Sequence, residues 1–299
     1  MRALRFHEYG GPLAVDDDVP APTAGPGRTL VTVAATAFNP VDLLIHGGFL
    51  EPALPHIPGV EMSGTTPDGR TVIAALPMNL AGAAAELVAV PDDLLAPAPR
   101  SIPLADAAAI PGGALTAWQA VTEHADVRAG QRVLVNGAGG GVGGFAVQFA
   151  KRRGATVVAT ASPRSTAAVR AAGADQIIDY TGTDLTTALT EPVDVVISLS
   201  RGVPGLSRLV RPGGVLVSAV GPAEPADGVR IVEMYVRADA AQLTEISRLV
   251  DAGEIRVDVS ERRPVAGLSE IFARAAKGDL RGKVVLLVQY GDGLRPVRT

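Results

Sequence analysis

Residues 132–144 read Arg132-Val133-Leu134-Val135-Asn136-Gly137-Ala138-Gly139-Gly140-Gly141-Val142-Gly143-Gly144, an apolar run that leads directly into a glycine cluster. The run is typical of a buried strand. Apolar residues then recur at helical spacing at Val142, Phe145, Ala146, Phe149 and Ala150. Gly154 follows where a C-terminal helix cap is expected. The stretch therefore predicts a strand, a tight glycine turn and a helix.

Two overlapping glycine patterns fit this turn. Gly139, Gly141 and Gly144 spell G-x-G-x-x-G, whereas Ala138, Gly140 and Gly143 spell A-x-G-x-x-G. In both registers, the missing side chains let the backbone approach a pyrophosphate closely. The N–H groups and the positive end of the helix dipole then attract the negative charge of the pyrophosphate. A flexible glycine loop would carry similar letters, but the strand before, the helix after and a second strand from Thr156 supply the required context. The stretch predicts a dinucleotide-binding unit.

The rest of the chain shows two different patterns of predicted strands and helices. Short apolar runs after residue 130 alternate with helical patterns, which favours a parallel sheet covered by helices; these runs are Thr156–Ala159, Gln176–Ile178, Val193–Ile197 and Gly214–Ala219. The first 110 residues instead carry short extended segments separated by Pro and Gly, and read as β-rich and barrel-like. After residue 240, two helical patterns end near Gly253 and Gly278, and an apolar strand follows at Val284–Val288.

The end of the second strand indicates which dinucleotide binds. An NAD enzyme needs an acid about 20 residues past the motif to bind the ribose hydroxyls, but residues 160–165 read Thr-Ala-Ser-Pro-Arg-Ser. The hydroxyls of Ser162 and Ser165 and the guanidinium of Arg164 suit an adenosine 2′-phosphate. NADPH is the expected cofactor; the alternative is that Arg164 is a solvated loop cation.

Composition excludes several other classes. With 19% charged residues and a formal net charge of −4, the chain is unsuited to nucleic acid. It has no apolar stretch of about 18 residues and no apolar run after Met1, so we expect a cytoplasmic protein without a membrane partner. Cysteine is absent, which removes disulfides, cysteine nucleophiles and cysteine-containing zinc sites.

Short segments in a specific order resemble the zinc-free quinone oxidoreductase, or ζ-crystallin-like, branch of the medium-chain dehydrogenase/reductase superfamily. Besides the glycine turn, they are Met1–Leu4, Gly10–Leu13, Asn39–Asp42, Pro58–Gly64, Leu115–Trp118, Gly173–Tyr180, Arg211–Gly214 and Gly282–Leu286. The resemblance implies an α/β fold in which a Rossmann doubly wound parallel sheet is inserted into a GroES-like β-barrel domain. The implied bounds are 1–112 and 239–299 for the barrel and 113–238 for the NADP-binding domain. It also implies a homodimer through an edge strand of the Rossmann sheet, at 230–237.

The resemblance allows the zinc ligands to be checked by position. Zinc-dependent relatives carry a ligating Cys where this chain has Asn39 and a ligating His where it has Val60. The four histidines show no paired ligand spacing. A metal-free site follows, and without a Lewis acid the acceptor should spread charge itself, as quinones and enones do.

Site residues are implied in the same way. Asn39 would lie beside the nicotinamide and could donate through its amide, and Thr116 would contact the nicotinamide side; their alternatives are a turn former before Pro40 and a helix N-terminal residue. The family favours the A-x-G-x-x-G register. The expected cofactor-binding residues are thus Ala138, Gly140, Gly141, Val142, Gly143, Ser162, Arg164, Tyr180 and Lys283. Tyr180 could instead pack on the sheet, and Lys283 could be solvated.

Three departures from the family alter the expected site. Leu44 and His46 stand where close relatives often have Tyr and Arg, and His46 could donate a proton or be a partly exposed loop residue. The segment between Gly64 and Asp68 is shortened. Ser198–Gly202 lacks the usual Asp and Gly pair, and its Arg201 could favour an anionic substrate.

The expected activity is metal-free hydride transfer from NADPH to a quinone or an α,β-unsaturated carbonyl. Enoyl-thioester reduction is the nearest alternative among enzymes. A catalytically silent NADPH-binding sensor or interaction protein is the alternative from another class, and a non-redox cyclase is a more remote one.

Overall fold

The computed structural model describes residues 1–78, 80 and 82–289, so the last ten residues of the expected second barrel segment lie outside the described part. The chain divides into two compact units. Unit 1 comprises Met1–Gly112, Ala238–Asp251 and Val259–Thr299, and unit 2 comprises Gly113–Arg237 and Ala252–Asp258. The short stretch Ala252–Asp258 belongs to unit 2, although the sequence assigns it to the barrel. Among the described residues, no helix is both long and apolar enough to cross a membrane.

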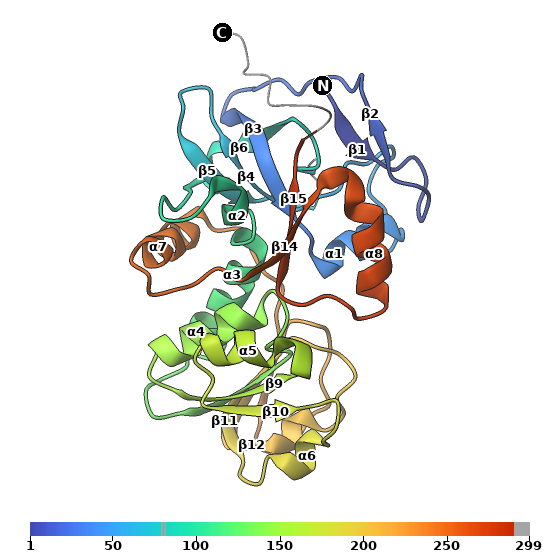
Figure 1. Cartoon of the computed structure of the whole chain (residues 1–299). Helices are drawn as coiled ribbons and strands as arrows, with labels where there is room; N and C mark the ends of the chain where they lie inside the picture. Colours follow the sequence, from blue (N-terminus) through green and yellow to red (C-terminus); the bar gives the residue numbers. More distant parts are fainter. Residues whose placement is uncertain (79, 81, 290–299) are drawn as a thin grey trace. The chain divides into compact units, whose positions relative to one another are not determined.

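Unit 2 is built on a parallel sheet whose described strands run in the order β10-β9-β8-β11-β12-β13. Figure 1 labels four of them, β9 to β12. The strands are β8 (Arg132–Asn136), β9 (Thr156–Ala161), β10 (Gln176–Asp179), β11 (Val193–Ser198), β12 (Val210–Ser218) and β13 (Arg230–Glu233). Val135 of β8 pairs with Ala159 of β9 on one side and Ile197 of β11 on the other. The chain reverses its winding direction at β8, which makes the carboxyl ends of β8 and β11 the ligand-binding switch point of a Rossmann sheet. The predicted fold class is confirmed.

Helices connect these strands. They are α4 (Gly143–Arg152), α5 (Pro163–Ala171), α6 (Leu185–Ala188) and the short η3 (Leu206–Leu209). The π-helix η2 (Gln119–His124) precedes β8. Helix α3 (Pro111–Trp118) leads into unit 2. The buried face of α4 carries Phe145, Ala146 and Phe149, as its 3.6-residue spacing predicts. The ring of Phe149 meets Trp118 edge-on at 5.2 Å. Gly154 has φ of +82°, so it ends this helix in the left-handed conformation that glycine favours.

Unit 1 contains a mostly antiparallel sheet in the order β14-β15-β3-β4-β5-β7, with β6 also paired to β3. Its strands are β3 (Arg28–Ala37), β4 (Glu61–Thr65), β5 (Thr71–Ala75), β6 (Leu87–Pro91), β7 (Ala96–Pro97), β14 (Val259–Pro264) and β15 (Lys283–Leu287). A separate ribbon pairs β1 (Ala3–Arg5) with β2 (Ala14–Asp16). Strands β14 and β15 are parallel because a helical crossover joins them.

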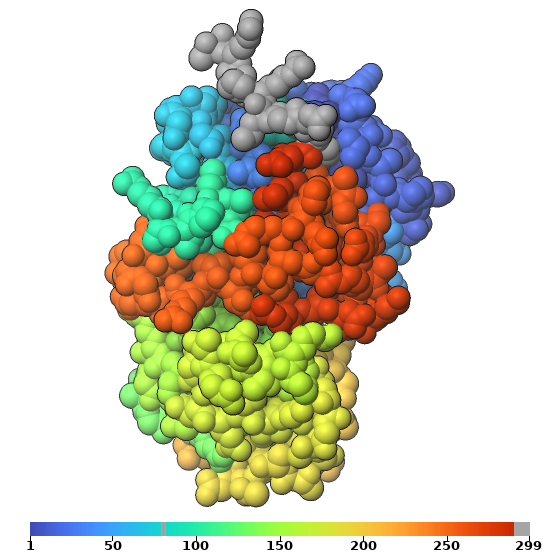
Figure 2. Space-filling model, viewed as in Figure 1, coloured from blue at the N-terminus to red at the C-terminus, as the bar shows by residue number. Residues whose placement is uncertain are grey.

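The helices of unit 1 bring both parts of its chain into one core. They are α1 (Pro40–His46), η1 (Asp92–Leu94), α2 (Leu104–Ala107), α7 (Ala240–Asp251), η4 (Val265–Gly267) and α8 (Leu268–Ala276). Ile271 and Phe272 of α8 pack in the same cluster as Ala3 and Leu4. Figure 2 shows the orange-red surface of this late segment directly beside the blue surface of the early one.

Strand β14 is one of the elements of unit 1 that the sequence did not predict. Its letters, Val-Ser-Glu-Arg-Arg-Pro, are mostly polar, and none of its residues is fully buried. It lies at the edge of the sheet, where only one side is paired, so no apolar alternation marks it.

Candidate functional site

The glycine turn after β8 is sterically selective. Gly137 has φ of +89°, a conformation that glycine adopts readily. A Cβ on Gly143 would overlap the Cα of Ala138 and the carbonyl oxygen of Gly137, whereas a Cβ on Gly144 would meet nothing within 4 Å. The close approach of helix and turn therefore requires glycine at position 143 and not at 144.

The first turn of α5 packs over the same loop. A Cβ on Gly139 would overlap the side-chain oxygen of Ser165, so Gly139 is also held by close packing. The side chain of Ser165 in turn accepts the backbone N–H of Ser162 at 3.1 Å. The glycine turn thus lies between the N-terminal ends of α4 and α5, where backbone N–H groups attract anions.

A polar network holds the turn at the carboxyl ends of three strands. The hydroxyl of Thr160 accepts the backbone N–H of Gly137 at 2.8 Å and donates to Oδ1 of Asn136 at 3.1 Å. The Nδ2 of Asn136 donates to the carbonyl of Ser200 at 3.2 Å. The backbone carbonyl of Asn136 accepts the N–H of Leu199 at 2.9 Å. These bonds join the ends of β8, β9 and β11, so the glycine turn and the segment after β11 are positioned together.

The residues expected to read the adenosine phosphate lie at the ends of β9 and β10. Ser162 is buried and is the N-cap residue of α5, and Arg164 is exposed in the first turn of that helix. Tyr180 directly follows β10 and is 54% exposed. The arrangement offers a hydroxyl, a guanidinium and an aromatic ring at one edge of the sheet.

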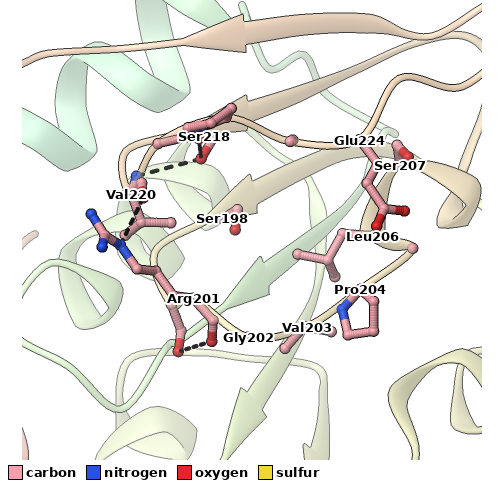
Figure 3. Close-up of a pocket in the computed structure, with 15 residues that line it drawn as sticks. Ser198, Arg201, Gly202, Val203, Pro204, Leu206, Ser207, Ser218, Val220 and Glu224 are labelled. Atoms are coloured by element: carbon pink, nitrogen blue, oxygen red, sulfur yellow. Dashed lines mark hydrogen bonds between the residues drawn. The ribbon is translucent and has the colours of Figure 1, made fainter.

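A pocket of about 530 Å³ opens at the carboxyl ends of β11 and β12 (Figure 3). Its lining combines serines, apolar residues and the charged Arg201 and Glu224; the remaining residues are Ser198, Ser200, Gly202, Val203, Pro204, Gly205, Leu206, Ser207, Ser218, Val220, Gly221, Pro222 and Ala223. The hydroxyl of Ser207 is buried and has no hydrogen-bond partner in the described part of the chain. The pocket adjoins the glycine turn, since a Cβ on Gly137 would lie 3.1 Å from the Cβ of Ser200.

Unit 1 contains a buried ionic network around Asn39 and Lys283. Lys283 is 3% exposed, and its ammonium contacts Glu61 Oε1, Asn39 Oδ1 at 2.9 Å and the carbonyl of Phe38 at 3.3 Å. These three oxygens account for the three N–H donors of the ammonium. The alternative of a solvated lysine is thereby wrong. In this network Lys283 has no donor left for a phosphate.

Glu61 is the central member of this network, and the sequence did not single it out. It is fully buried; Oε1 accepts Nδ2 of Asn39 at 2.7 Å, and Oε2 accepts the backbone N–H of Gly112 at 2.6 Å. The second N–H of the Asn39 amide donates to the carbonyl of Ala37 at 3.2 Å. Both amide hydrogens of Asn39 are therefore engaged. An acidic residue inside the otherwise small and apolar run from Pro58 to Gly64 was the signal available in the sequence.

Asp42 lies next to this network as a second buried carboxyl group. It accepts the backbone N–H of Asn39 at 2.8 Å and that of Gly59 at 3.2 Å. Burial raises the pKa of Asp42 to about 7, and nearby Glu61 adds to the rise. Through these two bonds Asp42 holds the backbone of Asn39 and of Gly59 in place.

His46 is not part of this network, and Thr116 belongs to unit 2. His46 ends α1, with Nε2 at 2.8 Å from the carbonyl of Gly11 and its ring between Phe6 and Phe272 at centroid distances of 5.0 and 5.1 Å. It is therefore a packed helix residue rather than a loop residue. The seven-residue helix α1 separates His46 from Asn39 by about 10 Å of backbone. Thr116 is half-buried in α3.

No cluster of three or more His, Cys, Asp or Glu side chains suited to a metal is found among the described residues. Near Asn39, the oxygens that could approach a cation already surround the Lys283 ammonium. The residues present therefore do not fit a zinc ion at this position.

Comparisons with known proteins agree with this architecture. The family model for zinc-binding dehydrogenases matches residues 172–286. A chloroplast envelope quinone oxidoreductase homolog of Arabidopsis thaliana is 29% identical, over 96% of this chain and 98% of the relative. An NADPH-dependent alkenal/one oxidoreductase of the same plant is 29% identical, over 96% of this chain and 79% of the relative.

A solved structure is also similar to this chain in both sequence and fold. The quinone oxidoreductase of Thermus thermophilus, whose structure was also determined with NADPH, is 30% identical, with a TM-score of 0.84 over 96% of this chain and 100% of that one. Both sheets of the present structure are those of such enzymes. The chain therefore belongs to the quinone oxidoreductase-like branch of the medium-chain dehydrogenase/reductase superfamily.

Proposed function

We propose that this oxidoreductase uses NADPH to reduce a quinone or an α,β-unsaturated carbonyl compound without a metal. The glycine turn carries the proposal, because its packing demands glycine at the third position of the A-x-G-x-x-G register. The quinone and alkenal/one oxidoreductase relatives support this class of acceptor.

We propose that unit 2 binds the cofactor along the carboxyl edge of its sheet. The backbone of Ala138, Gly140, Gly141, Val142 and Gly143 would hold the pyrophosphate, aided by the N-terminus of α4. Ser162, Arg164 and Tyr180 would surround the 2′-phosphate. The nicotinamide end would then point toward β11 and β12. When bound, NADPH supplies the hydride, so the protein has to hold and orient the reactants.

The polar groups of unit 1 would act by positioning. The Asn39 amide is held by Lys283 and Glu61 through short bonds and by Ala37 through a longer one at 3.2 Å. The bond to Ala37 is the one that an acceptor oxygen would most readily replace. Asn39 therefore stays our candidate donor, whereas Lys283 is better assigned to positioning Asn39 than to binding the cofactor. His46 and Thr116 stay candidates without further support from their contacts.

A steady-state screen tests the activity. Oxidation of NADPH should be followed at 340 nm with 1,4-naphthoquinone, a small enone and a crotonyl thioester, before and after treatment with EDTA. We expect turnover with the quinone or the enone and no loss with the chelator. Tight NADPH binding without turnover on any acceptor would instead support a silent binding protein, and turnover on the thioester alone would support an enoyl-thioester reductase.

Cofactor choice is tested at Arg164. We expect Arg164→Asp to lower the preference for NADPH over NADH by at least about tenfold, because a charge-assisted bond to the 2′-phosphate is replaced by repulsion. The ratio of kcat/KM for the two cofactors measures this. Arg170→Asp is the matched control, since Arg170 is exposed on the last turn of the same helix. An unchanged ratio in the Arg164 variant would remove this residue from cofactor recognition.

We also propose a homodimer through β13. This strand ends the described sheet with one side unpaired, and Tyr235 just beyond it is 85% exposed. An exposed aromatic residue beside an open edge favours association. Light scattering should give twice the chain mass, and Tyr235→Asp should shift it toward the monomer; a wild-type protein of single-chain mass would contradict the proposal.

A further inference from the structure

The pocket over β11 and β12 has a cation fixed at its rim. The Nε of Arg201 donates to the backbone carbonyl of Val220 at 2.9 Å, which holds the guanidinium at one side of the pocket (Figure 3). Arg201 is exposed, and its terminal nitrogens make no hydrogen bond or ion pair within the described residues. The two outer N–H₂ groups therefore remain available as a planar pair of donors, the geometry that suits a carboxylate or sulfonate.

The rest of the pocket combines serine hydroxyls with apolar side chains that could hold a conjugated ring or chain. Val203, Pro204, Leu206 and Pro222 line it, and Glu224 lies across from Arg201 in Figure 3. The carboxylate of Glu224 repels an anion placed at its own end of the pocket. An anionic group would therefore be directed to the Arg201 side, with the apolar body between the two.

In the proposed arrangement, the cofactor would not place an anion beside Arg201. In that arrangement, the pyrophosphate of NADPH lies at the glycine turn after β8, and its 2′-phosphate lies at Ser162 and Arg164 after β9. The reduced nicotinamide ring itself is uncharged. A negative charge beside Arg201 would thus come from the second substrate.

We infer that Arg201 makes this enzyme selective for acceptors that carry an anionic substituent on an apolar conjugated ring or chain. The inference rests on the proposed reductase function and names the class of its second substrate. Arg201 acts here as a specificity residue: it binds the substituent and takes no part in hydride transfer.

Two acceptors of the same ring system test this selectivity. The specificity constant kcat/KM should be measured with 1,4-naphthoquinone-2-sulfonate and with unsubstituted 1,4-naphthoquinone, and the first value divided by the second for each protein. Comparing this ratio between the wild type and its variants cancels the intrinsic reactivity of the two quinones. We expect Arg201→Gln to lower the ratio by about tenfold or more, because a hydrogen bond between two charged groups is stronger than one with a neutral partner. We expect Glu224→Gln to raise the ratio, because it removes the carboxylate that repels the sulfonate.

The matched control is Arg208→Gln. Arg208 is exposed in η3 but does not line the pocket, so this variant removes the same charge from the same unit. A similar fall in the ratio for both variants would indicate general electrostatic attraction and would overturn the inference. A raised KM for NADPH in Arg201→Gln, with an unchanged acceptor ratio, would assign Arg201 to the cofactor and would also overturn it.

A binding measurement separates this inference from the proposed function. Calorimetric titration of the sulfonate into NADP⁺-loaded protein needs no turnover, and we expect at least about tenfold weaker binding in Arg201→Gln. If neither a quinone nor an enone is reduced, the reductase proposal fails while the titration still decides the role of Arg201. If the neutral quinone is reduced but the variant binds the sulfonate as the wild type does, only the selectivity fails.

Discussion

Replacing Lys283 with Met is expected to lower the free energy of unfolding by about 3–5 kcal/mol, because it leaves the fully buried carboxylate of Glu61 without its cation. The hydrogen bonds from Asn39 and Gly112 would remain, but they do not neutralise the charge. Urea denaturation followed by circular dichroism measures the loss.

Two companion variants show whether the ion pair is the cause. The double variant Glu61→Gln with Lys283→Met removes both charges, so it should be more stable than Lys283→Met alone. Lys277→Met changes an exposed lysine at the end of α8 and should cost less than about 1 kcal/mol. A Lys283→Met protein as stable as the wild type would show that the buried pair does not stabilise the fold.

The second large effect is expected at the glycine turn. Gly143→Ala should weaken NADPH binding by about tenfold to a hundredfold, because the new methyl group pushes α4 away from Gly137 and Ala138. Displacements of this kind cost about 1–3 kcal/mol, and each 1.4 kcal/mol is a factor of ten in affinity. Fluorescence titration of NADPH measures the dissociation constant.

Gly144→Ala is the control, since a Cβ at that position has open space and alanine favours a helix. We expect its affinity for NADPH to stay within about twofold of the wild type. Equal losses in the two variants would contradict the A-x-G-x-x-G register. Circular dichroism of Gly143→Ala distinguishes a local shift from loss of the fold.

The fold of unit 2 could be predicted because its signals are local. Strand β8, the glycine turn and α4 follow one another within 21 residues, from Arg132 to Arg152, and each shows its own periodicity. Strand β14 escaped prediction because an exposed edge strand needs no apolar alternation. The residues of the turn fit two overlapping glycine registers, and the packing of Gly143 against Ala138 supports the A-x-G-x-x-G register.

The site of unit 1 was less accessible to prediction, because contacts between distant residues create it. Lys283 reaches Glu61 and Asn39 across 222 and 244 residues of sequence, and nothing near Lys283 in the chain announces a buried cation. His46 is a comparable case, since its partners Gly11 and Phe272 belong to segments far from α1.

By itself, the sequence determined the alternating architecture, the glycine turn, the absence of cysteine ligands and the lack of an acid after the second strand. Each of these depends on residue types within a short stretch. Only the tertiary structure decided that Lys283 is buried, that Glu61 joins it to Asn39, and that Arg201 lies on the rim of a pocket with Glu224 across from it. The physical reason is that burial and charge pairing are set by what the folded chain brings together, and residue spacing alone does not contain that information.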